Sequence, residues 1–331
     1  MHRHNVCRMA TPSEDGAVTG YLHPQYARSF SEFGRSRALP RSGGWILERS
    51  IADTDDRDAM GCYPLFACQR WSELRADVDD LGDSLVSLTL VTDPFGDYDR
   101  GALEQCFPDL AKPFKEHSVI DLGKPAEQTV DRGHRKEARR ALKRLVVEVH
   151  PNPVEFLDSW MSLHRHLVKR HGIAGIAAFS RAAFEQQLTT PGCTLLWARS
   201  GDEPIAATVY LSHGGVAHGH VLACSDVGYA QGALYALIWR AIEHFTGTHQ
   251  WINLMGVPGA DDAGSRGIRD FKRGWTTVTR TAWLCGRIFD RHRYNRLVEA
   301  THTMASRYFP AYRDNEMTRA QAAPAMSATR A

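Results

Sequence analysis

Short apolar runs separated by glycine, proline and polar turns dominate the chain, and they predict an alternation of strands and helices. The first part of the chain contains four strand candidates, at residues 45–48, 62–68, 85–91 and 118–122. The polar, unperiodic residues 1–42 and the last residues, 313–331, predict flexible ends. We therefore place a first α/β half at residues 43–125.

The second part of the chain, residues 126–286, has a more distinct order of elements. It begins with a predicted basic helix at residues 132–145, a short strand at 146–149 and helices at 156–171 and 179–188. Three strands with hairpin turns follow at residues 194–199, 205–212 and 216–224, and they predict an antiparallel meander. The remaining segments are a glycine-bearing loop (225–232), a helix (233–245), a strand (251–255), a basic helix (266–273) and a strand (276–284). Residues 287–312 predict a closing C-terminal helix.

Composition restricts the class of protein more than its function. The 331 residues are 43% apolar, which is enough for hydrophobic cores and excludes disorder of the whole chain. A net charge of +2 argues against a general polyanion binder, and no role on DNA is predicted. The richest apolar stretch, residues 233–245, contains Arg240, Glu243 and His244, so no membrane span is predicted. Seven cysteines without a C-x-x-C pair, and a start without an apolar leader, predict a reduced, cytoplasmic protein.

Several common catalytic and metal motifs are absent from the sequence. Neither the G-x-S-x-G nucleophile turn nor the G-x-x-x-x-G-K-[ST] phosphate loop occurs, which excludes the usual serine hydrolases and P-loop nucleotidases. Two histidine groups have spacings that could start a metal site: His218 with His220 on a strand, and His164, His166 and His171 on a helix. Because no cysteine or carboxylate at ligand spacing completes either group, we predict no metal.

Three stretches resemble a known superfamily. They are the basic helix around residues 134–140, the loop-to-helix turn at 226–235, and the segment 267–275, which contains Phe271-Lys-Arg-Gly-Trp. Together with the order of strands and helices they resemble the GNAT acyltransferase superfamily. Residues 131–283 are more closely similar to its FemAB-like branch, the peptidoglycan-bridge aminoacyl ligases and the BioF2-like acetyltransferase domains. The resemblance implies an α/β (α+β) GNAT-like fold, with two pseudo-repeated halves and a central mixed sheet flanked by helices.

The loop before residue 233 is the predicted site for the donor's pyrophosphate. Glycines let backbone N–H groups approach an anion, and the following helix adds the positive end of its dipole. The predicted cofactor-binding residues are Gly228, Tyr229, Gln231, Gly232 and Ala233, although Gln231 lies directly beside Gly232, unlike the usual GNAT spacing Q/R-x-x-G-x-G/A. The resemblance implies an acyl-CoA donor, such as acetyl-CoA, or alternatively an aminoacyl-tRNA.

Lys272 and Asp226 are the predicted catalytic residues. The family's matching lysine contacts substrate phosphate or the reacting acyl group, which implies that Lys272 stabilises a phosphate or a developing oxyanion. A general base must lie within about 3 Å of the reacting atom, and the spacing alone leaves Asp226, Asp270 and His220 open for that role.

The acceptor site is predicted from charge and position. Arg135 and Arg139 lie four residues apart on one helical face that could hold an acceptor diphosphate or a tRNA acceptor stem. Asn253 and Arg273 complete the predicted substrate-binding set, and Asp261-Asp262 is either an acceptor-lining loop or a solvated turn. The resulting hypothesis is an enzyme that moves an acyl group from acyl-CoA to an amine or hydroxyl on a sugar- or peptide-linked acceptor. The alternatives are an aminoacyl-tRNA-dependent ligase and a non-catalytic GNAT-like binding protein.

Overall fold

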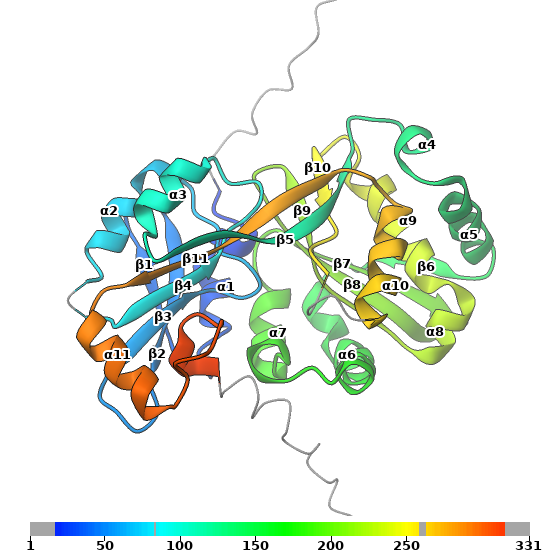
Figure 1. The fold of residues 1–331 in the computed structure, drawn as a ribbon. Helices are drawn as coiled ribbons and strands as arrows, with labels where there is room; N and C mark the ends of the chain where they lie inside the picture. The colour runs from blue at the N-terminus through cyan, green and yellow to red at the C-terminus, as the bar shows by residue number, and fades with distance from the viewer. Residues whose placement is uncertain (1–16, 83, 258–262, 315–331) are drawn as a thin grey trace, which may run out of the picture.

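The computed structural model describes residues 17–82, 84–257 and 263–314. The described strands form one 11-stranded mixed sheet in the order β1-β2-β3-β4-β11-β5-β10-β9-β8-β7-β6. Figure 1 shows two α/β halves side by side, with the long strands β5 and β11 running between them. The predicted fold class is therefore confirmed.

The same order of elements occurs twice. Each half has three antiparallel strands, a helix that crosses over to a strand parallel to the third, then a helix and a last strand. In the first half these are β1 (Arg35–Leu39), β2 (Gly44–Ser50), β3 (Arg57–Gly61), α2 (Leu74–Asp79), β4 (Ser87–Val91), α3 (Arg100–Cys106) and β5 (Leu110–Asp121). In the second they are β7 (Cys193–Ser200), β8 (Glu203–His213), β9 (Val216–Cys224), α9 (Ala233–Phe245), β10 (Trp251–Asn253), α10 (Ala263–Arg273) and β11 (Thr279–Ile288).

The last strand of each half is exchanged with the other half. Strand β5 ends the first half but pairs with β10, and β11 ends the second half but pairs with β4. The two exchanged strands also pair with each other, antiparallel. Neither half therefore has a complete sheet without the other, and a site beside β5 and β10 is built from both halves.

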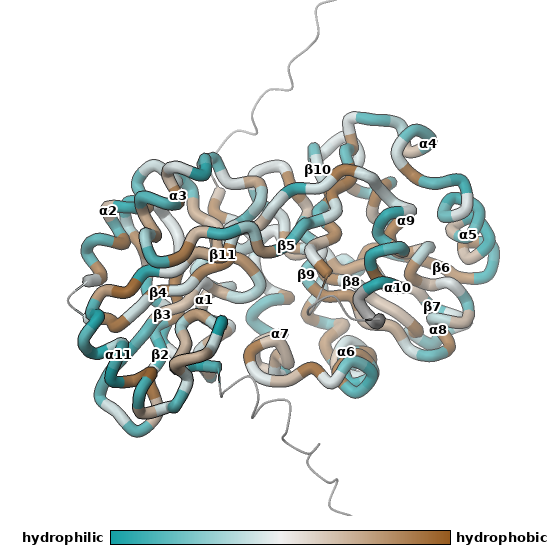
Figure 2. Tube along the Cα trace, in the orientation of Figure 1, coloured by the Kyte–Doolittle hydropathy of each residue, from teal (hydrophilic) through white to brown (hydrophobic). Residues whose placement is uncertain are grey.

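The segment between the halves supplies the helices that cover the second half. It contains α4 (Ala126–Thr129), α5 (Arg132–Leu142), β6 (Val146–Val149), α6 (Leu157–His171) and α7 (Arg181–Leu188). Helices α5 and α9 pack on the sheet face that bears Ile252 and Ala217, and α6 and α7 pack on the opposite face, which bears Val209 and Leu211. Helix α5 is mostly hydrophilic in Figure 2, and only the side of it that bears Ala138 and Ala141 is buried.

The N-terminal prediction is wrong from residue 17 onward. Residues 17–42 contain the 3-10 helix η1 (Gly20–Leu22), α1 (Pro24–Arg28) and β1. Tyr26 and Phe30 are fully buried beside α6 and α7 of the second half. Single aromatic anchors with no regular period hold this segment, so the sequence pattern gave no sign of them. Residues 1–16 lie outside the described part.

Three other element predictions are corrected by the structure. The strand expected at 62–68 lies earlier in the chain, as β3 at Arg57–Gly61. Within 62–68, Phe66 forms only an isolated bridge to Thr92. The loop expected at 225–232 contains helix α8 (Asp226–Gln231). The closing helix is shorter than expected, α11 (Arg291–Ala300), and the 3-10 helix η5 (Ala311–Arg313) follows it. Arg313, the first residue of the expected flexible tail, is buried.

The buried contact of Arg313 predicts a large effect on stability. Its Nε and Nη2 donate to Asp58 at 2.8 Å each, and the Asp58 side chain is fully buried. Arg313→Met should lower the free energy of unfolding by about 3 kcal/mol, because the buried carboxylate loses both of these bonds and keeps only Arg49 at 3.5 Å and the Tyr312 hydroxyl at 3.1 Å. Urea denaturation would measure the loss. Arg100→Met, which removes the exposed ion pair with Glu104, is the control and should change stability by less than about 1 kcal/mol. Equal effects of the two variants would contradict the assignment.

Candidate active site

The three stretches singled out in the sequence meet in one aromatic cluster. The ring of His134, on α5, lies 5.0 Å from the Tyr235 ring of α9, 5.5 Å from the Phe271 ring of α10 and 5.2 Å from the Trp275 ring. Its Nε2 also bonds the Phe271 carbonyl oxygen at 2.9 Å. His134 thus holds the basic helix against the segment that carries Lys272.

Gly274 is essential to this packing. A Cβ at Gly274 would lie 2.0 Å from Cε1 of His134, which is a severe overlap. Gly274→Ala should therefore cost at least about 1–3 kcal/mol of stability in thermal or urea denaturation. Gly267→Ala on α10 is the matched control, since a Cβ there meets nothing within 4 Å and alanine favours a helix. A Gly274→Ala protein as stable as the control would contradict the tight packing.

Lys272 lies beside the end of β10 in an environment that disfavours its charge. Its Nζ donates to the carbonyl oxygens of Met255 at 2.9 Å and Gly256 at 2.8 Å. Burial, with a contribution from the charge of Lys115, lowers the pKa of Lys272 to about 7. A Cβ at Gly256 would lie 3.0 Å from Cβ of Lys115 and 3.1 Å from Cδ2 of His117. Lys272, Lys115 and His117 therefore meet around Gly256.

Strands β9 and β10 separate next to this lysine. They pair in parallel only where Val216–His218 lie opposite Trp251–Asn253, whereas β9 continues to Cys224 paired with β8. The β8–β9 register shifts between Val209 and Tyr210, so His220 is an extra residue in β9. Beyond His218, β9 thus has an edge that β10 does not cover, and such an edge can bind an extended chain through backbone hydrogen bonds.

Asn253 occupies the point where the two strands separate. It is fully buried, and its Nδ2 donates to Nδ1 of His117 at 3.2 Å and to Nδ1 of His218 at 3.1 Å. Its Oδ1 accepts the N–H of Met255 at 2.8 Å. The predicted substrate-binding residue is therefore the centre of an internal network, and contact with substrate stays a prediction.

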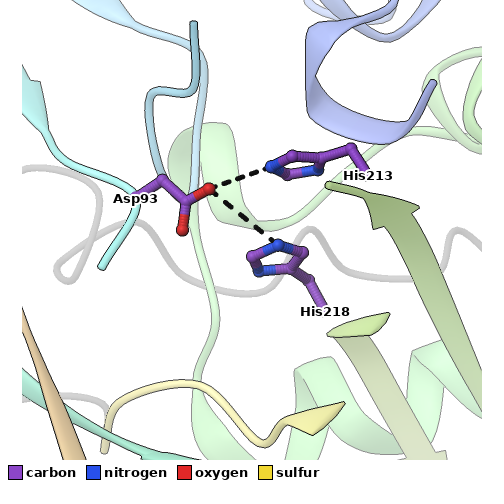
Figure 3. A group of neighbouring side chains, drawn as sticks. All are labelled: Asp93, His213 and His218. Atoms are coloured by element: carbon purple, nitrogen blue, oxygen red, sulfur yellow. Dashed lines mark hydrogen bonds and ion pairs between the residues drawn. The ribbon is translucent and has the colours of Figure 1, made fainter. Parts of the chain in front are cut away.

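A carboxylate of the first half lies next to this network and faces two stacked histidines of the second half (Figure 3). Oδ2 of Asp93 is 2.9 Å from Nε2 of His213 and 4.0 Å from Nε2 of His218, and Oδ1 accepts the Phe95 N–H at 3.0 Å. Although burial opposes ionisation, the two histidines and that N–H lower the pKa of Asp93 to about 2. The ligand atoms of the three residues lie within 4.8 Å of one another, so they are one group that could hold a metal ion.

The predicted pyrophosphate loop is largely helical. Ser225 caps α8, and its Oγ accepts the Gly228 N–H at 3.1 Å, so this N–H is used internally. Gly228 is required for space, because a Cβ there would lie 2.5 Å from the Ile205 carbonyl oxygen. Gly232, with φ +74°, joins α8 to α9. The N-terminus of α9, at Ala233, has no side-chain cap and is the remaining dipole end for an anion.

The other two residues predicted to bind the donor make contacts on α8. The guanidinium of Arg170 lies over the Tyr229 ring, 4.3 Å from its centroid. Gln231 donates from Nε2 to Oγ of Ser200 at a long 3.5 Å. A donor-binding role for either residue stays a prediction.

Asp226 and His220 are both engaged by other side chains. The Asp226 side chain is 89% exposed and pairs with Arg170 at 3.1 Å. His220 is buried, and both ring nitrogens are engaged, Nδ1 with Oη of Tyr21 at 3.1 Å and Nε2 with Oε1 of Gln187 at 3.1 Å. A role as general base stays a prediction for Asp226 and for His220.

The remaining predicted residues lie on helix surfaces. Arg139 is exposed on α5, whereas Arg135 is half-buried, with an Nε that has no hydrogen-bond partner among the described residues. Arg273 is exposed and pairs with the third base candidate, Asp270, at 3.6 Å. Asp261-Asp262 lies outside the described residues. Sequence reasoning missed Asp93, Lys115, His117 and His213, because no motif contains them and only the exchanged strands bring the halves together.

Comparison with known proteins supports the resemblance to the GNAT acyltransferases. Residues 129–273, which include α5, the meander, α9 and α10, match the family described as Acetyltransferase (GNAT) domain. The match covers 145 of the 331 residues, so this part of the chain is similar to a GNAT acyltransferase domain. No curated protein matches it.

Solved structures extend the structural similarity to both halves. The crystal structure of FemX has a TM-score of 0.60 at 11% identity, covering 82% of this chain and 92% of that chain. The C-terminal domain of a putative lysylphosphatidylglycerol synthetase from Agrobacterium fabrum has a TM-score of 0.57 at 14% identity, covering 83% and 89%. L-PGS from Bacillus licheniformis gives 0.54 at 15% identity, covering 83% and 95%. The fold of both halves together is therefore similar to that of FemX. No helix in the described ranges combines the length and the apolar character that crossing a membrane requires.

Proposed function

We propose that this protein transfers an acyl group to an amine or hydroxyl of a polar acceptor at the point where β9 and β10 separate. The main support is that the uncovered edge of β9 beyond His218 lies near the Lys272 amine, which is held beside the end of β10. An extended donor arm would lie along the edge, and backbone N–H groups would polarise the acyl carbonyl. Lys272 would stabilise the charge that develops on the carbonyl oxygen.

The reaction forms one bond and breaks one bond at the acyl carbon. The acceptor nitrogen or oxygen attacks that carbon, the bond to the donor's sulfur or oxygen breaks, and the proton that the acceptor loses ends on the departing sulfur or oxygen. Binding both substrates at one point supplies much of the rate enhancement by positioning. The acceptor we propose is peptide- or sugar-linked, consistent with a site built from both halves.

Acyl-CoA is the donor that the GNAT match favours. Its pyrophosphate would use the N-terminus of α9 at Ala233, because the Gly228 N–H is already bonded to Ser225. A thermal-shift titration with acetyl-CoA tests this donor, since a ligand at 100 times its dissociation constant adds about 2.7 kcal/mol of stability. Stabilisation by acetyl-CoA, followed by acylation of an amine or hydroxyl panel, is the expected result. No shift and no acylation would exclude this donor.

Aminoacyl-tRNA is a second donor, favoured by the surface of α5. Six exposed basic residues lie on this helix and just after it, at Arg132, Lys136, Arg139, Arg140, Lys143 and Arg144. If they contact RNA phosphates, Arg139→Glu with Lys143→Glu should weaken binding of charged tRNA and reduce the slope of log K against log salt by about 2. Arg28→Glu, at an exposed position on α1, is the control. Unchanged binding by the double variant would remove this donor site, and indifference to every donor would favour the non-catalytic alternative.

A further inference from the structure

The amide of Asn253 fixes the tautomer of two buried histidines. Because its Oδ1 accepts the Met255 N–H, its Nδ2 must face the rings and donate to both Nδ1 atoms. A ring nitrogen that accepts a hydrogen bond carries no proton, so in each neutral ring the proton is on Nε2. His117 and His218 are therefore both held with Nε2–H as a donor.

His117 lies beside the proposed reaction point. It lies on β5, the strand exchanged from the first half, and it packs on Gly256, whose carbonyl oxygen accepts from Lys272. The residue is only 3% exposed, and among the described residues its Nε2 has no hydrogen-bond partner. Because this nitrogen is not fully enclosed, its N–H can donate to a water or to a ligand atom.

We propose that Nε2–H of His117 donates a hydrogen bond to the carbonyl oxygen of the acyl group, and that Asn253 is the positioning residue that keeps it a donor. This inference rests on the proposed function. Burial and the charge of Lys272 lower the pKa of His117 to about 4, so the ring is neutral at pH 7. A neutral donor complements Lys272, because it stabilises the oxyanion without adding another cation beside Lys272 and Lys115.

The same tautomer argues against a metal ion between Asp93, His213 and His218. A metal-bound histidine uses one ring nitrogen as ligand and donates a hydrogen bond from the other. In His218 the Nδ1 accepts from Asn253, and the protonated Nε2 points toward the carboxylate (Figure 3). The group is thus best described as a buried carboxylate facing two imidazole N–H groups.

Two variants of His117 distinguish a role as hydrogen-bond donor from a role as general base. His117→Gln keeps an N–H near the position of Nε2 but cannot accept a proton at neutral pH, and His117→Ala removes both functions. We expect His117→Ala to lower kcat by about 10²-fold or more with little change in KM, and His117→Gln to stay within about tenfold of the parent. Equal loss in both folded variants, or no loss in either, would overturn the proposal.

The tautomer can be measured without any activity assay. Long-range ¹H–¹⁵N spectra of the parent protein should give protonated Nε2 and unprotonated Nδ1 in both histidines. In Asn253→Asp the carboxylate accepts instead of donating, so both protons should move to Nδ1, and Zn²⁺ affinity should rise above that of the parent. Protonated Nδ1 atoms or tight stoichiometric Zn²⁺ binding in the parent would contradict the inference. A correct tautomer without acyl transfer to any acceptor would contradict the proposed function alone.

Discussion

Lys272→Ala should lower kcat for acyl transfer by about 10²–10³-fold while the protein stays folded. The reason is the loss of a positioned donor whose Nζ is held by the Met255 and Gly256 carbonyl oxygens beside the proposed reaction point. Arg266→Ala is the matched control, because Arg266 is an exposed basic residue on the same helix, and its kcat should stay within a few-fold of the parent. Steady-state kinetics with the donor identified by thermal shift would measure both.

The pH dependence of the parent tests the same role. A group whose pKa is lowered to about 7 keeps its proton below that value and loses it above. If the ammonium is the active form, kcat should be constant below pH 7 and fall up to tenfold per pH unit above it. Lys272→Arg, if active, should move this fall to much higher pH, because the guanidinium stays charged. Activity that rises through pH 7 instead would make the amine a base, and Lys272→Ala at parental kcat would remove Lys272 from the site.

The sequence predicted the second half of the fold better than the first. The meander, the crossover helix and the last strands have regular periods and turn residues, so the order from β7 to β11 agrees with the predictions apart from α8. The buried N-terminal segment was missed, because Tyr26 and Phe30 fill space between elements distant in sequence and have no period. The exchange of β5 and β11 could not be predicted from local pattern, since pairing partners depend on the whole sheet.

The candidate site shows the same division. Lys272 belongs to the motif that the sequence identified. In the structure its amine lies just after β10, near Lys115 and His117. Asp226 is a base candidate by its chemistry alone, since spacing does not fix the base, and in the structure it lies exposed on helix α8, so its catalytic role stays a prediction. His117 and Asp93 come from the first half and have no local motif, so only the three-dimensional pairing makes them candidates.

Asp93→Ala should be among the most destabilising substitutions, at about 3–5 kcal/mol near pH 7. It removes the acceptor of the buried His213 Nε2 and of the Phe95 N–H, which are then left without a partner. Urea denaturation would measure the loss. Asp226→Ala is the control, because that carboxylate is 89% exposed in a surface ion pair, and its effect should stay below about 1 kcal/mol.

The pH dependence distinguishes loss of the Asp93 charge from loss of packing. Its pKa is lowered from 3.8 to about 2, so ionised Asp93 stabilises the fold fully above pH 4, and the contribution is lost as the pH falls through 2. About two pKa units correspond to roughly 2–3 kcal/mol. Asp93→Asn, which keeps the shape, should be less stable than the parent by about that amount at pH 7, and the difference should close near pH 2. A difference that does not vary with pH would mean that the carboxylate's charge contributes nothing, and that packing alone joins Asp93 to His213 across the two halves.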